Sequence, residues 1–350
     1  MKTWDAIIVG GGIIGLSLAI SLRKQGLRVL IVERGELGRE ASHAAAGMLA
    51  ASGSEIPGAL QPLAEESARM YPEFVHELED ESGTKVDLRD QGTILVSEDG
   101  KFPEKAEPVP AHRLHSLDPE LRLSQTMQSA YLRERSVDPR AVVAAAIKAA
   151  KHRAVDVSSG SEVKTVLVKG DRVTGVETDK TSYAAPIVVN CAGAWSGCVG
   201  PTHFPVKPVK GQILSLVGGP GLNHVIRSEN VYLVPRSDGR IVIGSTLENA
   251  GYNKRVDVDT IESLFQAAIE LVPALAGSRQ HEAWAGLRPG TPDELPILGE
   301  ISASGYFVAT GHYRDGILLA PITAQVMAEI ILHKSPAHDL RAFSAARFQS

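Results

Sequence analysis

The sequence of 350 residues predicts an α/β fold with two domains, in which a larger domain with a parallel sheet is interleaved with a smaller domain built on an antiparallel sheet. Three observations predict this arrangement. The N-terminal segment follows the order strand, glycine-rich turn, helix and strand. Segments of the same kind recur in the middle and at the end of the chain. The segments between them are rich in strands and hairpin turns.

The N-terminal segment carries the strongest signal. The apolar run Ala6–Val9 ends at a glycine-rich turn, residues 10–15, which leads into a helical stretch; residues 28–33 then form a second apolar run. This order of elements is the unit that binds a dinucleotide. The unpaired N–H groups and the partial positive charge of the helix N-terminus suit its phosphates. The alternative is a glycine-rich turn in an unrelated α/β protein.

Three glycines and one acidic residue fit a dinucleotide in detail. Gly10 permits the tight turn, Gly12 lets the backbone approach a pyrophosphate, and Gly15 lets the helix pack closely on the strand. Glu33, 18 residues beyond Gly15, is placed to accept hydrogen bonds from a ribose. Its charge would repel a 2′-phosphate, so the sequence predicts FAD or NAD rather than NADP.

Further segments follow in the first half of the chain. Residues 41–49 are small and lack a strong helical face, which suits either backbone that lies against a flat ligand or an ordinary alanine-rich helix. Helical spacing covers residues 62–82, and residues 92–97 form a predicted strand. Residues 101–110 are rich in Pro, Lys and Glu, so we expect a surface loop.

The second half of the chain also contains predicted helices and strands in alternation. A helix is predicted over residues 138–152, with Asp138 as its N-cap and a proline in its first turn. Strands at 161–168 and 172–178 form a hairpin, and a buried strand from Ile187 opens onto small residues. The elements predicted after these are strands at 212–217, 231–235 and 240–245, a helix at 260–271, a strand at 306–310, a loop at 311–316 and a helix at 317–332.

The pieces of the cofactor domain are separated along the chain. We expect this Rossmann-like domain over residues 1–85, 136–204 and 284–350, and the antiparallel-sheet substrate domain over residues 86–135 and 205–283. A nicotinamide-dependent dehydrogenase normally shows a contiguous set of βα units. The interleaving therefore favours a flavoprotein.

Composition and charge exclude several classes of function. The chain has 36 basic and 41 acidic residues, a net charge of −5, and no block of Lys and Arg, so neither nucleic acid nor an anionic membrane surface is an expected partner. Cys191 and Cys198 are too few for a disulfide framework or a zinc site, which favours the cytoplasm, and we expect both in the core. Glycines interrupt the uncharged run at 6–22, which argues against a targeting or membrane segment.

Two arginines are candidates for binding a carboxylate. Arg288 and Arg314 lie in segments with Gly, or with Gly and Pro, that we expect to be loops, and a planar guanidinium offers paired donors to a carboxylate. Either arginine could instead be a structural ion pair or a surface residue. Tyr232 alternates along a predicted strand, so its hydroxyl could reach a carboxylate or lie in the core.

The loop before the last helix offers no general base. Gly316 opens that helix, whose N-terminus could stabilise negative charge on a flavin or simply start the helix. His312 has no acidic or nucleophilic companion nearby, so we interpret it as a packing residue. Neither a Ser–His–Asp order nor a metal-binding cluster is present in the sequence pattern, and we expect no metal.

Together these residues resemble the glycine oxidases of thiazole (thiamine) biosynthesis, within the D-amino acid oxidase and sarcosine oxidase superfamily. The resemblance runs from residue 7 to about residue 332. Its most specific segments are residues 44–49, 232–236, 284–291 and 311–321. It implies a Rossmann-like FAD-binding domain interleaved with a smaller antiparallel-sheet substrate domain, and a noncovalent FAD.

The resemblance also implies which residues hold the FAD. They lie at the glycine turn, after the second strand, near the phosphates, near the ring, by the adenine and along the pyrimidine edge. The residues at the glycine turn are Gly10, Gly12, Ile13, Ile14 and Gly15, and those after the second strand are Glu33 and Arg34. Near the phosphates are Ala41 and Ser42, near the ring Ala46, Gly47 and Met48, and by the adenine Val163. Along the pyrimidine edge are Gly311, His312, Tyr313, Arg314, Asp315, Gly316, Ile317 and Leu318. Ala192, Gly193 and Trp195, after the strand from Ile187, are expected at a further edge of the cofactor site.

For the substrate, the resemblance implies that Arg288 binds the carboxylate, with help from Arg314 and Tyr232. Two positions depart from the family pattern. Leu247 stands where relatives often carry Met, and Asn230 where some carry His. Both would line the substrate pocket, so the preference among glycine, sarcosine and small D-amino acids stays open.

The implied reaction is oxidative deamination of a small amino acid or amine by hydride transfer to flavin N5, with no protein acid or base. The products are an imine or 2-oxo acid, ammonia and hydrogen peroxide, and the imine could pass to thiazole synthase. The resemblance further implies a homotetramer. The alternatives are a dehydrogenase of the same fold with an acceptor other than dioxygen, a non-catalytic dinucleotide-binding module, and an NAD-linked dehydrogenase.

Overall fold

A six-stranded sheet lies at the centre of the first domain in this computed structural model, which describes residues 3–52, 56–200, 202–301 and 303–348. The strand order is β19-β20-β13-β1-β2-β9, and every neighbouring pair is parallel except β19 with β20. The strands are β1 (Ala6–Val9), β2 (Val29–Val32), β9 (Asp156–Ser158), β13 (Ile187–Asn190), β19 (Ile297–Glu300) and β20 (Tyr306–Thr310). Segments from the beginning, middle and end of the chain therefore share one sheet, as the interleaved pattern predicts.

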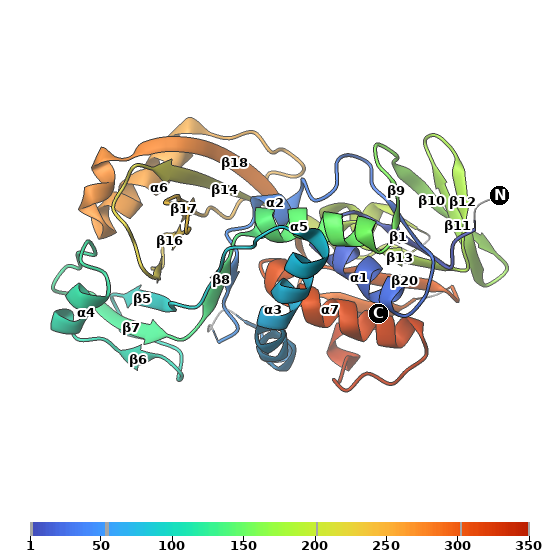
Figure 1. Ribbon diagram of the computed structural model, residues 1–350, viewed down its shortest axis with the longest axis horizontal. Coiled ribbons are helices and arrows are strands. Elements are labelled where there is room, and N and C mark those ends of the chain that lie inside the picture. Colours follow the sequence, from blue (N-terminus) through green and yellow to red (C-terminus); the bar gives the residue numbers. More distant parts are fainter. Residues whose placement is uncertain (1–2, 53–55, 201, 302, 349–350) are drawn as a thin grey trace.

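Helices cover one face of this sheet and a small sheet covers the other (Figure 1). Alternate strand residues divide between the two cores: Ile8 and Ile31 face the helices, whereas Ile7 and Leu30 face the small sheet. The helices are α1 (Ile13–Lys24), α3 (Gln61–Ser82), α5 (Pro139–His152) and α7 (Gly316–Ile331). The small sheet consists of β10 (Val163–Lys169), β11 (Arg172–Thr178) and β12 (Ser182–Ala184).

Local sequence explains where these helices begin. The side chain of Asp138 accepts hydrogen bonds from the backbone N–H groups of Arg140 and Ala141, at 2.9 and 3.4 Å, and so caps α5 as predicted. Helix α3 has a proline in its first turn and ends at Gly83, whose φ of 63° suits glycine. Within the described residues, no helix has both the length and the apolar composition needed to cross a membrane.

An eight-stranded sheet forms the second domain. Its order is β18-β14-β17-β16-β15-β5-β7-β6, and all pairs are antiparallel except β15 with β5. The strands are β5 (Thr93–Ser97), β6 (Glu107–Pro108), β7 (Gln128–Leu132), β14 (Lys207–Val217), β15 (Val225–Arg227), β16 (Tyr232–Pro235), β17 (Ile241–Gly244) and β18 (Arg279–Gly290). Its apolar core lies against α4 (Ala111–Leu117), α6 (Val258–Leu271) and η2 (Pro273–Gly277).

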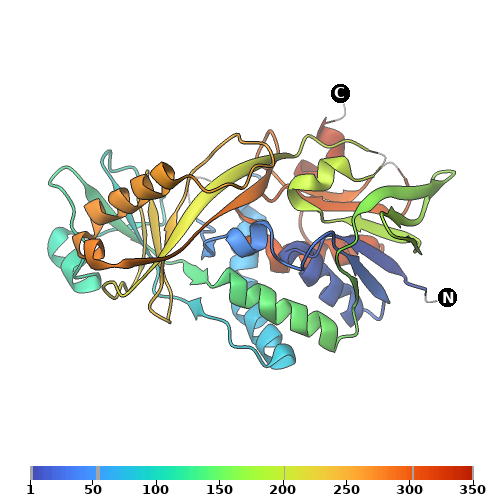
Figure 2. The same ribbon diagram turned by 90° about the horizontal axis from the view of Figure 1, so that it is seen from above.

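Short elements join the two domains. Figure 2 shows the domains side by side along the long axis, with the long strands β14 and β18 reaching toward the first domain. The joining elements are α2 (Ala41–Ala44), η1 (Gly193–Cys198) and a small sheet of β3 (Met48–Leu49), β8 (Arg135–Val137) and β4 (Leu88–Arg89). The described chain ends with η3 (Arg341–Phe343) and η4 (Ala345–Phe348).

Three local expectations differ from the structure. The segment around Arg288 is not a loop: it belongs to β18, whose residues pair with β14, so the expected domain boundary at residue 284 falls inside a strand. Proline and glycine are tolerated there because β18 is at the edge of its sheet. Strand β14 begins earlier than expected, at Lys207. The expected loop at 101–110 contains the two-residue strand β6.

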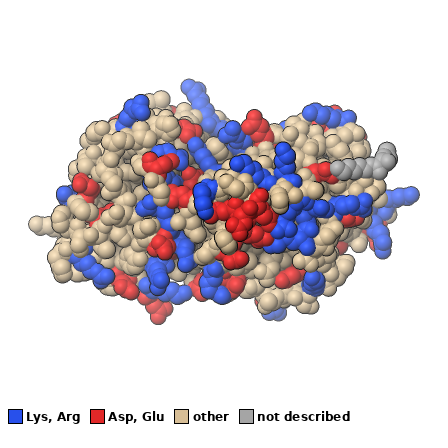
Figure 3. Space-filling view, in the orientation of Figure 1, with Lys and Arg blue, Asp and Glu red and all other residues tan. Residues whose placement is uncertain are grey.

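Charge is spread over the surface. On the face shown in Figure 3, acidic side chains near the centre are bordered by basic ones, and Lys and Arg are scattered among Asp and Glu elsewhere. Ion pairs such as those of Arg153 with Glu77 and Glu81 connect basic and acidic side chains. On this face, side chains of opposite charge therefore lie next to one another.

Candidate active site

A pocket of about 560 Å³ lies between the two domains. Its walls come from the β1–α1 turn, α2, η1, the loop before α7 and the face of the eight-stranded sheet that is turned away from α6. Of the residues expected to hold FAD, only Gly15, Gly311 and Leu318 are not on its wall. All five residues expected at the substrate, Asn230, Tyr232, Leu247, Arg288 and Arg314, line it as well.

The glycine turn leaves no room for a side chain at Gly10 or Gly15. Gly10 has a φ of 106°, and a Cβ there would lie 2.5 Å from the carbonyl oxygen of Cys191. A Cβ on Gly15 would lie 2.1 Å from the carbonyl oxygen of Gly10, so this glycine acts behind the pocket wall rather than on it. Gly12 lines the pocket directly, and Ser42 Oγ accepts a hydrogen bond from Ile13 N at 3.0 Å. Bare backbone and a helix N-terminus suit a pyrophosphate.

Glu33 and Arg34 follow β2 and line the pocket wall. The carboxylate of Glu33 accepts hydrogen bonds from the backbone N–H groups of Gly11 and Gly35, at 2.8 and 2.9 Å, so it also fixes the turn. Arg34 lies over Trp195, with Cζ 3.5 Å from the ring centroid. Tyr252 stacks on the same indole at 5.4 Å between centroids, a contact that the sequence pattern did not indicate.

The loop before α7 lines another wall of the pocket. His312 is buried, and its Nε2 lies 3.0 Å from Thr323 Oγ1. Burial lowers the pKa of His312 to about 3, so the ring is neutral, in agreement with its interpretation as a packing residue. Helix α7 begins at Gly316, which brings its N-terminus to the pocket.

The low pKa of His312 predicts a pH dependence of stability. The unfolded histidine binds a proton below about pH 6.5, whereas the folded one does so only near pH 3. The unfolded state therefore binds more protons as the pH falls below 6.5, and the folded state loses about 2 kcal/mol from this group by pH 5. Urea unfolding at pH 7.5 and pH 5 should show a larger loss for the wild type than for His312→Gln, and equal losses would contradict the assignment.

Arg288 extends from β18 into the pocket. Its Nη2 donates a hydrogen bond to Ser245 Oγ at 2.7 Å, and its Nη1 donates one to the carbonyl oxygen of Thr246 at 3.2 Å. The guanidinium forms no ion pair with a carboxylate of the described residues. Burial lowers the pKa of Arg288, but a guanidinium stays charged at neutral pH. The result is a cation on a pocket wall that is held by neutral groups.

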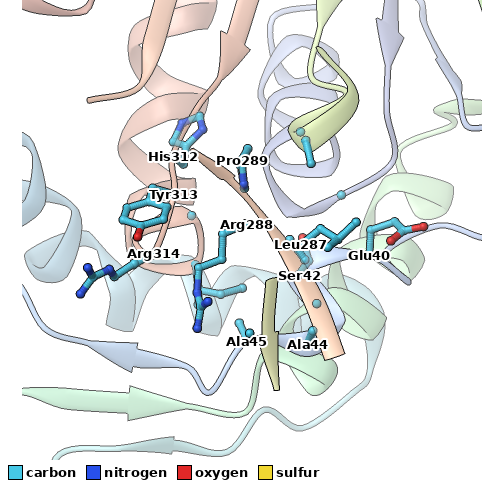
Figure 4. A pocket seen from close by; sticks show the side chains of 18 of the residues that line it. Glu40, Ser42, Ala44, Ala45, Leu287, Arg288, Pro289, His312, Tyr313 and Arg314 are labelled. Atoms are coloured by element: carbon cyan, nitrogen blue, oxygen red, sulfur yellow. The ribbon is translucent and has the colours of Figure 1, made fainter. Parts of the chain in front are cut away.

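Tyr232 and Arg314 lie near this cation. Burial raises the pKa of Tyr232 and the charge of Arg288 lowers it; burial is the larger effect, so the phenol is neutral and can donate. The positive charge of Arg314 also lowers the pKa of Arg288. Figure 4 shows Arg288, Tyr313 and Arg314 at one end of the pocket, with Glu40 and Ser42 toward the other. The structure thus shows that these groups lie close together, which the spacing of the residues in the sequence could not show.

Other positions refine or correct the sequence analysis. Asn230 lines the pocket, and Leu247 does so with 60% of its surface exposed. Cys191 is buried as expected, but Cys198 is exposed, so its assignment to the core was wrong. Cys198 follows a buried strand but lies at the end of η1, where it lines the pocket and its Sγ is 3.8 Å from the hydroxyl of Tyr252. Among the described residues, no group of three His, Cys, Asp or Glu side chains could hold a metal ion.

The fold and the pocket define a flavin-dependent oxidoreductase of two interleaved domains. The chain belongs to the family described as FAD dependent oxidoreductase, whose pattern matches residues 5–330. The residues present fit the cofactor, because the bare glycine turn, the two helix N-termini and the open wall at Ala46 and Met48 form one continuous pocket.

Among known relatives, the chain is 36% identical to the bifunctional protein ThiO/ThiG of Trichormus variabilis over 364 residues, which cover 99% of this chain and 55% of that protein. The chain thus spans about half the length of such relatives. It is 33% identical to the glycine oxidase of Pseudomonas aeruginosa over 357 residues, with 97% and 98% covered. The crystal structure of glycine oxidase from Geobacillus kaustophilus superposes with a TM-score of 0.92 at 30% identity, covering 99% of both chains.

Proposed function

We propose that this protein is an FAD-dependent oxidase of glycine and other small amino acids or amines, such as sarcosine and small D-amino acids. The observation that carries the proposal is the guanidinium of Arg288, which lines the cofactor pocket and, among the described residues, hydrogen-bonds to a hydroxyl and a carbonyl oxygen rather than to a carboxylate. A guanidinium that is held by neutral groups is suited to bind an anionic ligand. The similarity to proteins named glycine oxidase supports an amino acid as that ligand.

The side chains of the pocket have simple roles in this proposal. Arg288 binds the substrate carboxylate, and the neutral phenol of Tyr232 donates a further hydrogen bond to it. Ser245 and Thr246 hold the guanidinium in place, which fixes the α-carbon relative to the cofactor. Arg314, exposed beside Tyr313, adds positive charge around the carboxylate end of the site.

FAD, when bound, supplies the two-electron acceptor that dioxygen regenerates. His312, the histidine of the pocket wall, is not placed to act as a base, since burial lowers its pKa to about 3 and its ring is bonded to Thr323. The substrate amine therefore loses its proton to solvent rather than to a side chain. The products on this proposal are a 2-oxo acid, ammonia and hydrogen peroxide.

The proposal extends to assembly and partners. We infer a homotetramer in the cytoplasm whose imine product passes to thiazole synthase. The two cysteines, Cys191 and Cys198, are unpaired, which suits a reducing compartment. The bifunctional ThiO/ThiG relatives, in which this chain matches about half of the length, support a coupled second activity.

A peroxide assay with the purified yellow protein tests this function. Glycine, sarcosine, D-alanine and D-proline are each supplied in air, and the same additions are made without oxygen while the flavin absorbance is followed. We expect peroxide formation in air and bleaching without oxygen for at least one of these substrates. Bleaching without peroxide would indicate a dehydrogenase with another acceptor. Neither signal with any of the four would contradict the proposal.

A further inference from the structure

Gly211 lies directly beneath the guanidinium of Arg288. A Cβ on Gly211 would lie 2.4 Å from Nη1, 2.5 Å from Nη2 and 2.6 Å from Cζ of Arg288. These are its three nearest heavy atoms, and all belong to that one group. Carbon atoms in contact are normally about 3.5–4 Å apart. Any side chain at position 211 would therefore have to displace the guanidinium.

The sheet topology explains this close approach. Strand β14 lies between β18 and β17, and Arg288 is on β18 whereas its partners Ser245 and Thr246 follow β17. The side chain of Arg288 must therefore cross β14 to reach them. In the β14–β18 register, Gly211 is opposite Gly286, two residues from Arg288 and on the same face of the sheet. Gly211 is the point at which Arg288 crosses β14.

The backbone gives no other reason for glycine at this position. Gly211 is an interior residue of β14, and its φ lies outside the left-handed region that favours glycine. Glycine in a strand interior weakens the strand because it has no side chain to pack and loses more entropy on folding. The close approach of the Arg288 guanidinium is thus the reason for glycine at this position that the structure offers.

We propose that Gly211 is a positioning residue for the substrate carboxylate. Because Gly211 has no side chain, the guanidinium of Arg288 can lie directly against the backbone of β14. The adjoining volume of the pocket then stays open for the amino acid. The proposal rests on the proposed function, because it assumes that Arg288 binds that carboxylate. A side chain at Gly211 would lift the guanidinium from Ser245 and Thr246 into the volume that the substrate needs.

The test compares Gly211→Ala with Gly277→Ala, a glycine of the same domain with no atom within 4 Å of an added Cβ. Three quantities are measured on the FAD-loaded proteins: kcat and KM for glycine, kcat/KM for glycine ethyl ester, and the Kd of acetate from the flavin absorbance. In Gly211→Ala we expect the KM for glycine and the Kd of acetate to rise about tenfold to a hundredfold. Turnover of the ester, which has no carboxylate for Arg288 to bind, should fall less than that of glycine, and Gly277→Ala should match the wild type throughout.

A double variant separates positioning from a general structural role. Because the three heavy atoms nearest to the added Cβ all belong to Arg288, Gly211→Ala in an Arg288→Ala background should cost nothing further in KM or Kd. If Gly211→Ala alone fails to fold, the double variant should recover folding and FAD. A double variant that still fails, or that loses further affinity for acetate, would overturn the inference.

The remaining outcomes separate this inference from the proposed function. Wild-type values of KM and Kd in Gly211→Ala would overturn the role of Gly211 while the oxidase function stands. A wild-type protein that neither oxidises glycine nor binds acetate would remove the proposed function, and this inference with it.

Discussion

An Arg288→Ala variant is expected to keep its FAD and to lose most of its efficiency toward glycine. The guanidinium supplies the pocket with a cation that is held by neutral partners, Ser245 and Thr246. Removing one partner of a desolvated charge pair typically costs about 2–5 kcal/mol. For glycine we therefore expect kcat/KM to fall on the order of 100-fold or more, mainly through KM. Steady-state peroxide assays measure both constants.

Arg279→Ala provides a matched control, because Arg279 lies at the other end of the same strand, β18, and is exposed. It should leave both constants unchanged. Glycine ethyl ester supplies a second control, since it has no carboxylate for Arg288 to bind and should lose far less than glycine. Unchanged kinetics for glycine in Arg288→Ala, with normal FAD content, would remove Arg288 from the carboxylate site.

The fold was largely predictable because its signals are local. The apolar run Ala6–Val9, the glycine turn behind it and the Asp138 cap each specify their own element. Interleaving followed from the order of these elements along the chain. Strand β18 was missed because Gly286, Pro289 and Gly290 give the pattern of a loop, and only its position at the edge of a sheet makes them acceptable.

The site was predictable only as a set of candidates. The glycine turn and Glu33 follow from a local motif, and nearly all residues implied by the family resemblance line one pocket. The neighbourhood of Arg288 was not predictable, because Ser245, Thr246 and Gly211 meet it only through the register of β14, β17 and β18. Gly211 lies just before the strand predicted at 212–217, so the sequence analysis did not treat it as a glycine inside a strand, which is the signal that points to a close approach.

A Gly10→Ala variant is expected to lose FAD and to be strongly destabilised. Gly10 has a φ of 106°, which alanine adopts only at a cost of about 1–3 kcal/mol. In addition, its Cβ would lie 2.5 Å from the carbonyl oxygen and 2.8 Å from the carbonyl carbon of Cys191, so the backbone after β1 and β13 must move apart. Both residues line the pocket, and their displacement moves Gly12 away from the phosphates. Flavin absorbance after gel filtration measures the cofactor that remains.

Gly26→Ala separates the two causes, because Gly26 also has a positive φ, 87°, but an added Cβ would meet nothing within 4 Å. That variant should carry the backbone strain alone, with a lower Tm and full FAD content. If Gly10→Ala resembles Gly26→Ala in both respects, the turn tolerates a side chain, and the contact with Cys191 is not what requires glycine at position 10. If only Gly10→Ala loses flavin, the contact between the ends of β1 and β13 is what shapes the cofactor site.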